Sequence, residues 1–408
     1  MKVKELIASQ KATFLLGLLG LYLVSAGTSW AVFSLLKGGS GENSPIVDTN
    51  ELESARSKIT ELPKTEKCPI NGKLFTKPEK TIWEGRRPIT VMIENHVDSR
   101  PPEGLSKADV VYEAVAEGGI TRFLGVFYCG VAGAEVEVAP VRSVRVYFID
   151  WASEYGEYPI FMHVGGANDF GGFGDTVKEA RALELLATIG WRVPKGNDFD
   201  TIYDSGVPVF RRNPGRLKSV GKEDIAVEHT MVANLDRAYE EAEKRGYGAK
   251  GSEGDSWDKS FISWTFSNEK PLSSPKVSEI SFEFWSNKPE YEVKWTYNKD
   301  NNSYLRFNGE VKHTDLAFEN TQITSKNVVI VFLTERGPVD RNKHMLYTTT
   351  GEGKALIYQN GDEVEATWKK KSRTDRTRFY DAKGKEINFV EGEIWIEAVP
   401  KGNKVNVK

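Results

Sequence analysis

Cysteine and histidine are scarce in this sequence of 408 residues, which contains two cysteines and five histidines. Two cysteines exclude a disulfide-dense scaffold and a structural zinc site built from four cysteines. The histidines show no metal-binding spacing, and Gly-x-Ser-x-Gly, Walker and Cys–His signatures are absent. The sequence therefore predicts neither a metal site nor another cofactor.

An excess of charge of one sign is also missing. The chain has 55 Lys and Arg against 58 Asp and Glu, a formal net charge of −3. Nucleic-acid binders usually show a basic balance or a basic stripe, so we expect no nucleic-acid partner. A hydrophobic share of 39% is ordinary for a globular protein, and the length predicts two folded domains.

The strongest signal is an uncharged, mainly apolar segment over residues 12–36. At 1.5 Å per residue, a helix of this length exceeds the roughly 30 Å hydrocarbon core of a bilayer. We predict a transmembrane anchor or uncleaved signal over 12–36. The basic residues before it place residues 1–11 in the cytoplasm, and the bulk of a single-pass chain then lies on the extracytoplasmic side of the cytoplasmic membrane. A cleaved signal peptide is the alternative, because small residues precede Val32.

The rest of the chain divides by its hydrophobic pattern. Glycine, serine and proline after the apolar segment predict a flexible tether, and we expect a linker over 37–79. Segments typical of strands and helices alternate from 80 to 250, which predicts an α/β layered domain. From 260 to 400 the apolar period is two and Asn-Gly turns occur at 308–309 and 360–361, which predicts a mainly antiparallel β domain. The fold class is thus α+β, preceded by the N-terminal transmembrane helix.

Individual elements of the first domain can also be predicted. Apolar runs favour strands over residues 88–95, 121–129 and 158–164. Apolar spacing of three and four residues favours helices over residues 106–118, 144–155, 176–189 and 234–245.

Several motifs resemble the YerB-like lipoprotein family of bacteria. They are Met92-Ile93-Glu94-Asn95, Gly104 to Glu113, Glu117 to Phe123, Pro140 to Arg145, His163 to Gly166, Asn360-Gly361 and Trp395-Ile396. The resemblance covers about residues 70–400 and implies two paired domains of unassigned function on the outer face of the cytoplasmic membrane. It implies no established active site. One feature departs from the family: no cysteine precedes Cys68, so a protein anchor would replace the lipid.

Arginines gather around the predicted strand ends. Arg142-Ser143-Val144-Arg145 follows a strand and opens a helix, where free N–H groups and guanidinium donors favour an anion. Arg122 lies near a strand start and Arg100 in the loop after the first strand. If the sheet is parallel, some of these arginines could lie together at one of its edges. We expect a phosphate, pyrophosphate or carboxylate site here. Ion pairing with nearby acids is the alternative.

Two histidines and two glutamates complete the candidate site. His163 ends a predicted strand, and His229 precedes a predicted helix. Each is a candidate ligand or acid/base group, or else a satisfied structural histidine. Glu113 and Glu117 lie four residues apart on the predicted helix 106–118, as acid/base carboxylates or as partners of the arginines.

Cys68 and Cys129 form the predicted disulfide. Both follow the apolar segment, and an even pair in an exported chain favours a bridge over two free thiols. The bridge would close a loop of about 60 residues and fix the end of the tether to the first domain.

These observations predict a membrane-anchored extracytoplasmic protein of the cell envelope. Its partners would be the membrane, through residues 12–36, and a cell-wall polymer, an anionic ligand or another envelope protein. The alternative is an envelope enzyme that acts on an anionic glycan or phosphate-linked polymer through the arginines. The basic residues over 369–378 predict a solvated loop first, and contact with anionic lipid or wall polymer second.

Overall fold

The computed structural model describes residues 56, 58–201, 209–251 and 254–408. The predicted cytoplasmic segment 1–11, the predicted anchor 12–36 and the first part of the linker lie outside these residues. Within the described ranges, no helix combines the length and apolarity needed to cross a bilayer.

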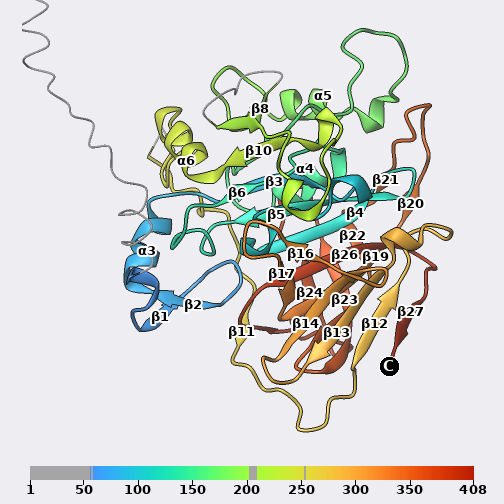
Figure 1. The fold of residues 1–408 in the computed structure, drawn as a ribbon. Coiled ribbons are helices and arrows are strands. Elements are labelled where there is room, and N and C mark those ends of the chain that lie inside the picture. Colours follow the sequence, from blue (N-terminus) through green and yellow to red (C-terminus); the bar gives the residue numbers. More distant parts are fainter. Residues whose placement is uncertain (1–55, 57, 202–208, 252–253) are drawn as a thin grey trace, which may run out of the picture. The chain divides into compact units, whose positions relative to one another are not determined.

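A ten-stranded sheet organises the folded unit (Figure 1). Its strand order is β24-β23-β22-β19-β26-β4-β5-β3-β7-β8. In chain order the strands are β3 (Ile89–Glu94), β4 (Val110–Glu117), β5 (Ile120–Phe127), β7 (Ile160–His163), β8 (Asp198–Asp200), β19 (Asn327–Leu333), β22 (Gly351–Gln359), β23 (Asp362–Lys370), β24 (Arg378–Tyr380) and β26 (Ile394–Pro400). The predicted strands 88–95, 121–129 and 158–164 are found as β3, β5 and β7.

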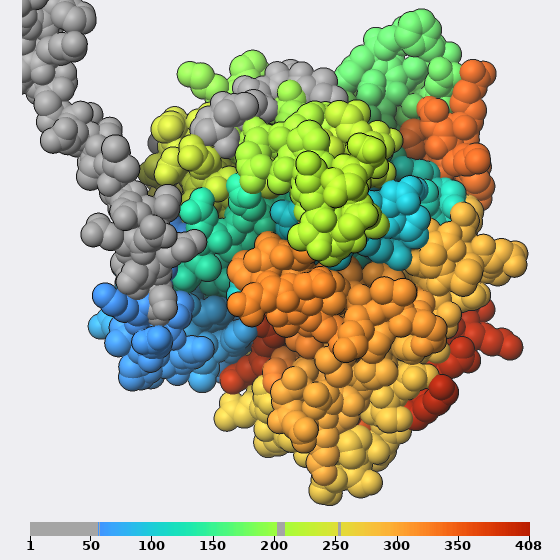
Figure 2. Space-filling view, viewed as in Figure 1, coloured from blue at the N-terminus to red at the C-terminus, as the bar shows by residue number. Residues whose placement is uncertain are grey.

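The sheet joins the two halves of the chain. β26 pairs in parallel with β4, with Ile394 opposite Val110 and Glu397 opposite Glu113. All residues of β26 are buried, as are all residues of β3, which is typical of strands covered on both faces. In the space-filling view, orange segments of the second half also lie directly against teal and green segments of the first half (Figure 2).

Short helices and a small sheet accompany the first half of the chain (Figure 1). The helices are α4 (Val146–Ala152), α5 (Ala182–Thr188) and α6 (Leu235–Lys244), and the sheet contains β6 (Glu137–Val138), β10 (Met231–Asn234) and β9 (Phe210–Arg212). Asn234 caps α6 by accepting a hydrogen bond from the Arg237 N–H at 3.0 Å, so the predicted helix 234–245 is confirmed. The predicted helices 144–155 and 176–189 are shorter in the structure, as α4 and α5.

The second half of the chain builds a further antiparallel sheet. It contains β12 (Glu279–Phe282), β13 (Val293–Asn298), β14 (Ser303–Asn308), β15 (Val311–Lys312), β18 (Thr324–Ser325) and β27 (Val405–Val407). Both predicted Asn-Gly hairpins are confirmed, as β14–β15 and β22–β23. In the second, Asn360 and Gly361 have φ of 58° and 74°, the pair of positive angles that such a two-residue turn requires.

The remaining pairs are short. They are β1 (Lys64–Lys67) with β2 (Leu74–Thr76), β11 (Phe266–Ser267) with β25 (Phe389–Val390), β16 (Thr314–Asp315) with β17 (Thr321–Gln322), and β20 (Glu335–Arg336) with β21 (Leu346–Tyr347). Single 3₁₀ turns cover Val97–Ser99, Leu105–Lys107, Lys178–Ala180, Lys218–Val220, Val227–His229 and Pro289–Tyr291.

The predicted helix 106–118 is wrong, because most of this segment forms β4. β4 lies inside the sheet between β26 and β5, and its first seven residues are buried. A strand covered on both faces loses the polar alternation that marks an exposed strand, so its apolar spacing resembled that of a helix.

The predicted linker 37–79 is folded in its last part. β1 and β2 pair there, and α3 (Lys77–Glu84) begins within it. Thr76 and Glu79 form a capping box, in which Thr76 Oγ1 accepts from the Glu79 N–H and Glu79 Oε2 accepts from the Thr76 N–H. This Thr-x-x-Glu pattern is the signal in the sequence that marks the start of α3.

Candidate functional site

Charged residues meet at one end of β3, β4 and β5. Glu94 ends β3, Glu117 ends β4, and Arg122 follows the turn into β5. The segment 142–145 runs beside them, because the Arg142 N–H donates to the Met92 carbonyl at 2.9 Å. We call the group the arginine–carboxylate cluster; it consists of Glu94, Glu117, Arg122, Arg142, Arg145 and His229.

Glu117 holds two of the arginines. Its Oε1 accepts from Arg122 Nη2, and its Oε2 accepts from Arg145 Nη2 at 2.7 Å. Burial raises the pKa of Glu117, but the two guanidinium groups outweigh burial and hold this pKa at about 2. Glu117 is therefore ionised at any physiological pH and fixes both arginine side chains.

Glu94 holds the third arginine and a histidine. Its Oε1 accepts from Arg142 Nε at 3.0 Å, and its Oε2 lies 2.7 Å from His229 Nδ1. Burial raises the pKa of Glu94, but His229, Arg142 and Arg122 together lower it by more, so the net shift is downward. A carboxylate only accepts hydrogen bonds, so His229 donates through Nδ1.

Arg122 connects the two halves of the cluster. Its Nη1 donates to the Ser143 carbonyl at 3.0 Å, one residue from Arg142. Ser143 thus contributes through its backbone. Three guanidinium groups face two carboxylates, which leaves one excess positive charge, and the Arg142 side chain is 26% exposed. The arrangement combines the predicted ion pairing with a surface that attracts an anion.

Arg100 lies apart from the cluster. Its Nε donates to the Asn95 side chain at 2.9 Å and its Nη1 to the Glu290 carbonyl at 2.7 Å. Its guanidinium also lies 4.8 Å from the centre of the Tyr291 ring. Burial lowers the pKa of Arg100 to about 10. The side chain connects the two halves of the chain and does not reach the expected anion site.

His163 is a buried residue whose side chain bonds to partners outside the cluster. Its Nδ1 lies 2.8 Å from the Gly165 carbonyl, and its Nε2 lies 2.6 Å from Asp198 Oδ1. Both partners only accept hydrogen bonds, so both ring nitrogens donate and the imidazole is cationic. Burial lowers the pKa of His163, but Asp198 and Asp200 raise it more, and the net shift is upward. The geometry supports the structural alternative and not an acid/base role.

This ion pair predicts a loss of stability at alkaline pH. Because the folded-state pKa of His163 is raised, its contribution is complete below about pH 6.5 and disappears as pH rises through the folded-state pKa. We expect the free energy of unfolding to fall more steeply between pH 6 and pH 10 in the wild type than in His163→Gln. Urea titrations across this range measure the difference. Equal slopes in the two proteins would contradict the assignment.

Glu113 and Glu117 do not form a pair of acid/base groups. On a strand, residues four apart are separated by about 13 Å, against about 6 Å on a helix. The register also shifts between Val115 and Glu117, which turns Glu117 to the face of Arg122 and leaves Glu113 on the other face. Glu113 is buried, and its Oε1 accepts from Thr121 Oγ1 at 2.6 Å while its Oε2 accepts from Arg306 Nη2. Glu117 alone belongs to the cluster.

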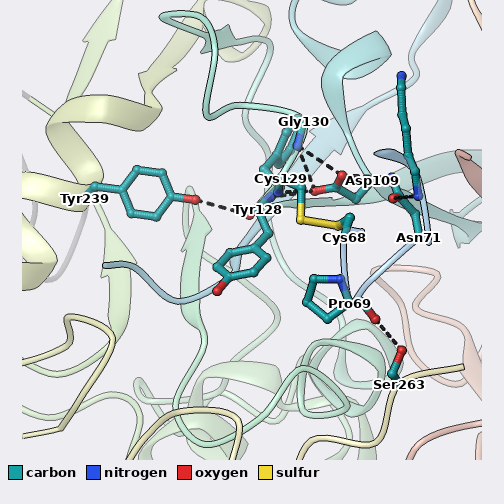
Figure 3. The surroundings of a disulfide bond; sticks show 11 residues. Cys68, Pro69, Asn71, Asp109, Tyr128, Cys129, Gly130, Tyr239 and Ser263 are labelled. Carbon is teal, nitrogen blue, oxygen red and sulfur yellow. Dashed lines mark hydrogen bonds between the residues drawn. A yellow bond between two sulfur atoms is a disulfide. The ribbon is translucent and has the colours of Figure 1, made fainter. Parts of the chain in front are cut away.

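Cys68 and Cys129 form a disulfide with a Cα–Cα distance of 6.0 Å and a sequence separation of 61 (Figure 3). Beside it lies Asp109, which the sequence did not single out. Asp109 Oδ2 accepts from the N–H groups of Tyr128 and Cys129 at 2.7 and 2.9 Å (Figure 3). Burial raises the pKa of Asp109 to about 7, although these hydrogen bonds act in the opposite direction. This buried carboxylate orders the chain around the bridge.

The basic residues over 369–378 are only partly solvated. Lys370 is buried, and its Nζ donates to Glu154 Oε1 at 2.7 Å. The buried guanidinium of Arg376 lies 3.5 Å from the centre of the Trp264 ring and 4.4 Å from that of Tyr155. These two cations stabilise the interior, so the predicted solvated loop is wrong for both.

Four cavities elsewhere are lined by other residues. The largest, of about 990 Å³, lies between α5 and the β20–β21 pair and is lined by Arg181, Arg336 and Tyr347 among others. The other three have volumes of about 650, 320 and 430 Å³. The arginine–carboxylate cluster reaches the surface through Arg142 and Glu117, which are partly exposed.

Comparisons with known proteins agree on one family. "Protein of unknown function (DUF3048) N-terminal domain" matches residues 75–247, and the DUF3048 C-terminal domain matches residues 280–396. The "Putative lipoprotein YerB" of Bacillus subtilis (strain 168) is 27% identical over 357 residues, which cover 85% of this chain and 89% of that protein. The crystal structure of the YerB protein from Bacillus subtilis has 24% identity and a TM-score of 0.63, covering 84% of this chain and 100% of that chain, which shows a shared fold.

Proposed function

We propose, from the premise that the chain belongs to the two-domain DUF3048 family, that it is an extracytoplasmic cell-envelope protein held to the cytoplasmic membrane by its N-terminus. The family resemblance of the sequence motifs is confirmed by these matches. The similarity to a protein described as a lipoprotein supports attachment to a membrane. This chain has no cysteine before Cys68, so the apolar residues 12–36 replace the lipid as the anchor in our proposal.

The disulfide supports the extracytoplasmic side of the membrane. Disulfides persist in oxidising compartments and are rare in the cytosol. Cys68 and Cys129 are bonded and buried beside Asp109. The basic residues before the apolar segment agree with this orientation.

Membrane attachment predicts the behaviour of the protein in cell fractions. After lysis, we expect the chain to stay in the membrane pellet through washes with high salt, because a spanning helix holds more strongly than charge. Immunodetection of the pellet and supernatant measures this. Release of the protein by salt, or recovery of a soluble form shortened by about 30 residues, would contradict anchoring and indicate cleavage.

We further propose that the arginine–carboxylate cluster binds an anionic group of an envelope polymer. The observation that carries this proposal is that three guanidinium groups face only two carboxylates and that Arg142 is partly exposed.

A thermal-shift screen of the full-length chain in detergent tests this binding. Poly(glycerol phosphate) and a polyuronate serve as the anionic probes, and uncharged dextran serves as the neutral probe. We expect stabilisation by an anionic probe, reduced in Arg142→Ala and in Arg145→Ala, because ligands that bind the folded state raise its melting temperature. Shifts that persist unchanged in both variants would count against the site.

A further inference from the structure

We infer that His96, Asp98 and His229 form a binding site for a divalent transition-metal ion, with Zn²⁺ as the best-matched ion. One ligand atom from each side chain can be chosen so that all three lie within 4.8 Å of one another. His96 Nδ1 lies 3.6 Å from Asp98 Oδ2, a separation that suits two ligands of one ion. The sequence did not indicate this site, because its third ligand lies more than 130 residues from the other two.

His229 is oriented for this role by Glu94. The 2.7 Å contact between Glu94 Oε2 and His229 Nδ1 assigns the proton to Nδ1 and leaves Nε2 with its lone pair free. Carboxylates bonded to the second ring nitrogen are the usual support of metal-binding histidines, since they fix the tautomer and the ring orientation. Glu94 is itself buried and held by Arg142, so the orientation is stable.

His96 and Asp98 are brought together by the 3₁₀ turn Val97–Ser99. His96 caps this turn, and its Nδ1 accepts from the Asp98 N–H at 3.2 Å. Nδ1 is therefore unprotonated and lies beside the Asp98 carboxylate, and an ion bound there would take the place of the Asp98 N–H on its one lone pair. The His96 ring stacks on the His229 ring, with centroids 5.1 Å apart and planes at 18°, which keeps the two histidines side by side.

The chemistry and access of the site fit a transition metal. Two imidazoles and one carboxylate are a common ligand set for zinc, with a fourth position left for water or another ligand. The Asp98 side chain is 72% exposed and the His96 side chain 29%, so an ion can enter from solvent. Lys222 is the nearby cation on this turn, and its Nζ is held by the Val97, Asp98 and Arg100 carbonyls.

Calorimetric titration of the metal-free, full-length chain in detergent with ZnCl₂ tests the site. We expect one equivalent to bind, and His96→Gln and Asp98→Asn each to weaken the affinity at least tenfold. Both side chains are exposed or half-exposed, so circular dichroism of the variants should match that of the wild type. Asp255→Asn, an exposed aspartate elsewhere, is the matched control and should bind as the wild type does.

Glu94→Gln adds a readout for the supporting carboxylate, and we expect it to weaken zinc binding about 10- to 100-fold. Absence of binding to the wild type, or an affinity unchanged in both His96→Gln and Asp98→Asn, would overturn the site. The titration contains no polymer, so its outcome is separate from that of the proposed anion binding.

Discussion

Replacing Arg306 with methionine is expected to lower the free energy of unfolding by about 3–5 kcal/mol. Arg306 lies on β14, where its Nη2 donates to Glu113 Oε2 and its Nε lies 3.9 Å from Glu397 Oε1. All three side chains are buried, and the two glutamates face each other across the β4–β26 pair. Without the guanidinium, this pair would keep a buried negative charge with no cation beside it.

The surroundings of Arg306 explain why one cation balances the charge of the two buried glutamates. Burial and the neighbouring Glu113 raise the pKa of Glu397 well above its usual value, so Glu397 is protonated and the pair carries one negative charge. Burial and the cation of Arg306 lower the pKa of His313, so that ring is neutral. Its Nδ1, 2.8 Å from Arg306 Nη1, therefore accepts a hydrogen bond.

Urea denaturation of Arg306→Met and of a surface control measures this effect. Lys354→Met removes one member of the exposed Lys354–Glu365 pair on β22–β23 and should cost no more than about 1 kcal/mol. Arg306→Met combined with Glu113→Gln should recover part of the loss, because it also removes the unpaired charge. A loss for Arg306→Met as small as that of the control would contradict the interpretation.

Removal of the Cys68–Cys129 disulfide has the second large expected effect. A closed loop with a sequence separation of 61 corresponds to about 4 kcal/mol in the loop-entropy description. The bridge joins the β1–β2 pair to the end of β5, so without it that pair is held to the central sheet only by non-covalent contacts such as the Asn71–Asp109 hydrogen bond. We expect Cys68→Ser/Cys129→Ser to unfold at a lower urea concentration than the oxidised wild type.

The reduced wild type provides the internal control. A reductant should lower the unfolding midpoint of the wild type to near that of the double variant, and it should leave the double variant unchanged. Unchanged unfolding of the wild type after complete reduction, verified by thiol counting, would contradict a stabilising bridge.

Local signals in the sequence predicted the local structure well. The Asn-Gly pairs predicted both hairpins. At 360–361 both residues have positive φ angles, whereas at 308–309 only Gly309 does and Asn308 belongs to β14. Apolar spacing predicted α6, and the structure shows that the Asn234 side chain caps its start. β4 was missed because its parallel partner β26 lies some 280 residues later, and the burial of both faces is invisible without that partner.

The candidate site could be predicted only where its residues lie close together in the sequence. Arg122, Arg142 and Arg145 come from successive elements, and the structure brings them together as expected. Glu94 was missed as a partner because its contacts come from 48 and 135 residues away. The role of His163 stayed open between a ligand and a structural histidine, because Asp198, its partner, approaches only when β8 pairs with β7.

The most direct test of the proposed function is a calorimetric titration of the full-length chain with poly(glycerol phosphate), at low and at high salt. We predict saturable binding that weakens with salt, is reduced at least tenfold in Arg142→Ala, and is unchanged in Arg211→Ala, an exposed arginine paired with Glu137. Dextran should give no heat of binding. Equal affinity in Arg142→Ala and Arg211→Ala, or no binding by the wild type, would contradict the account.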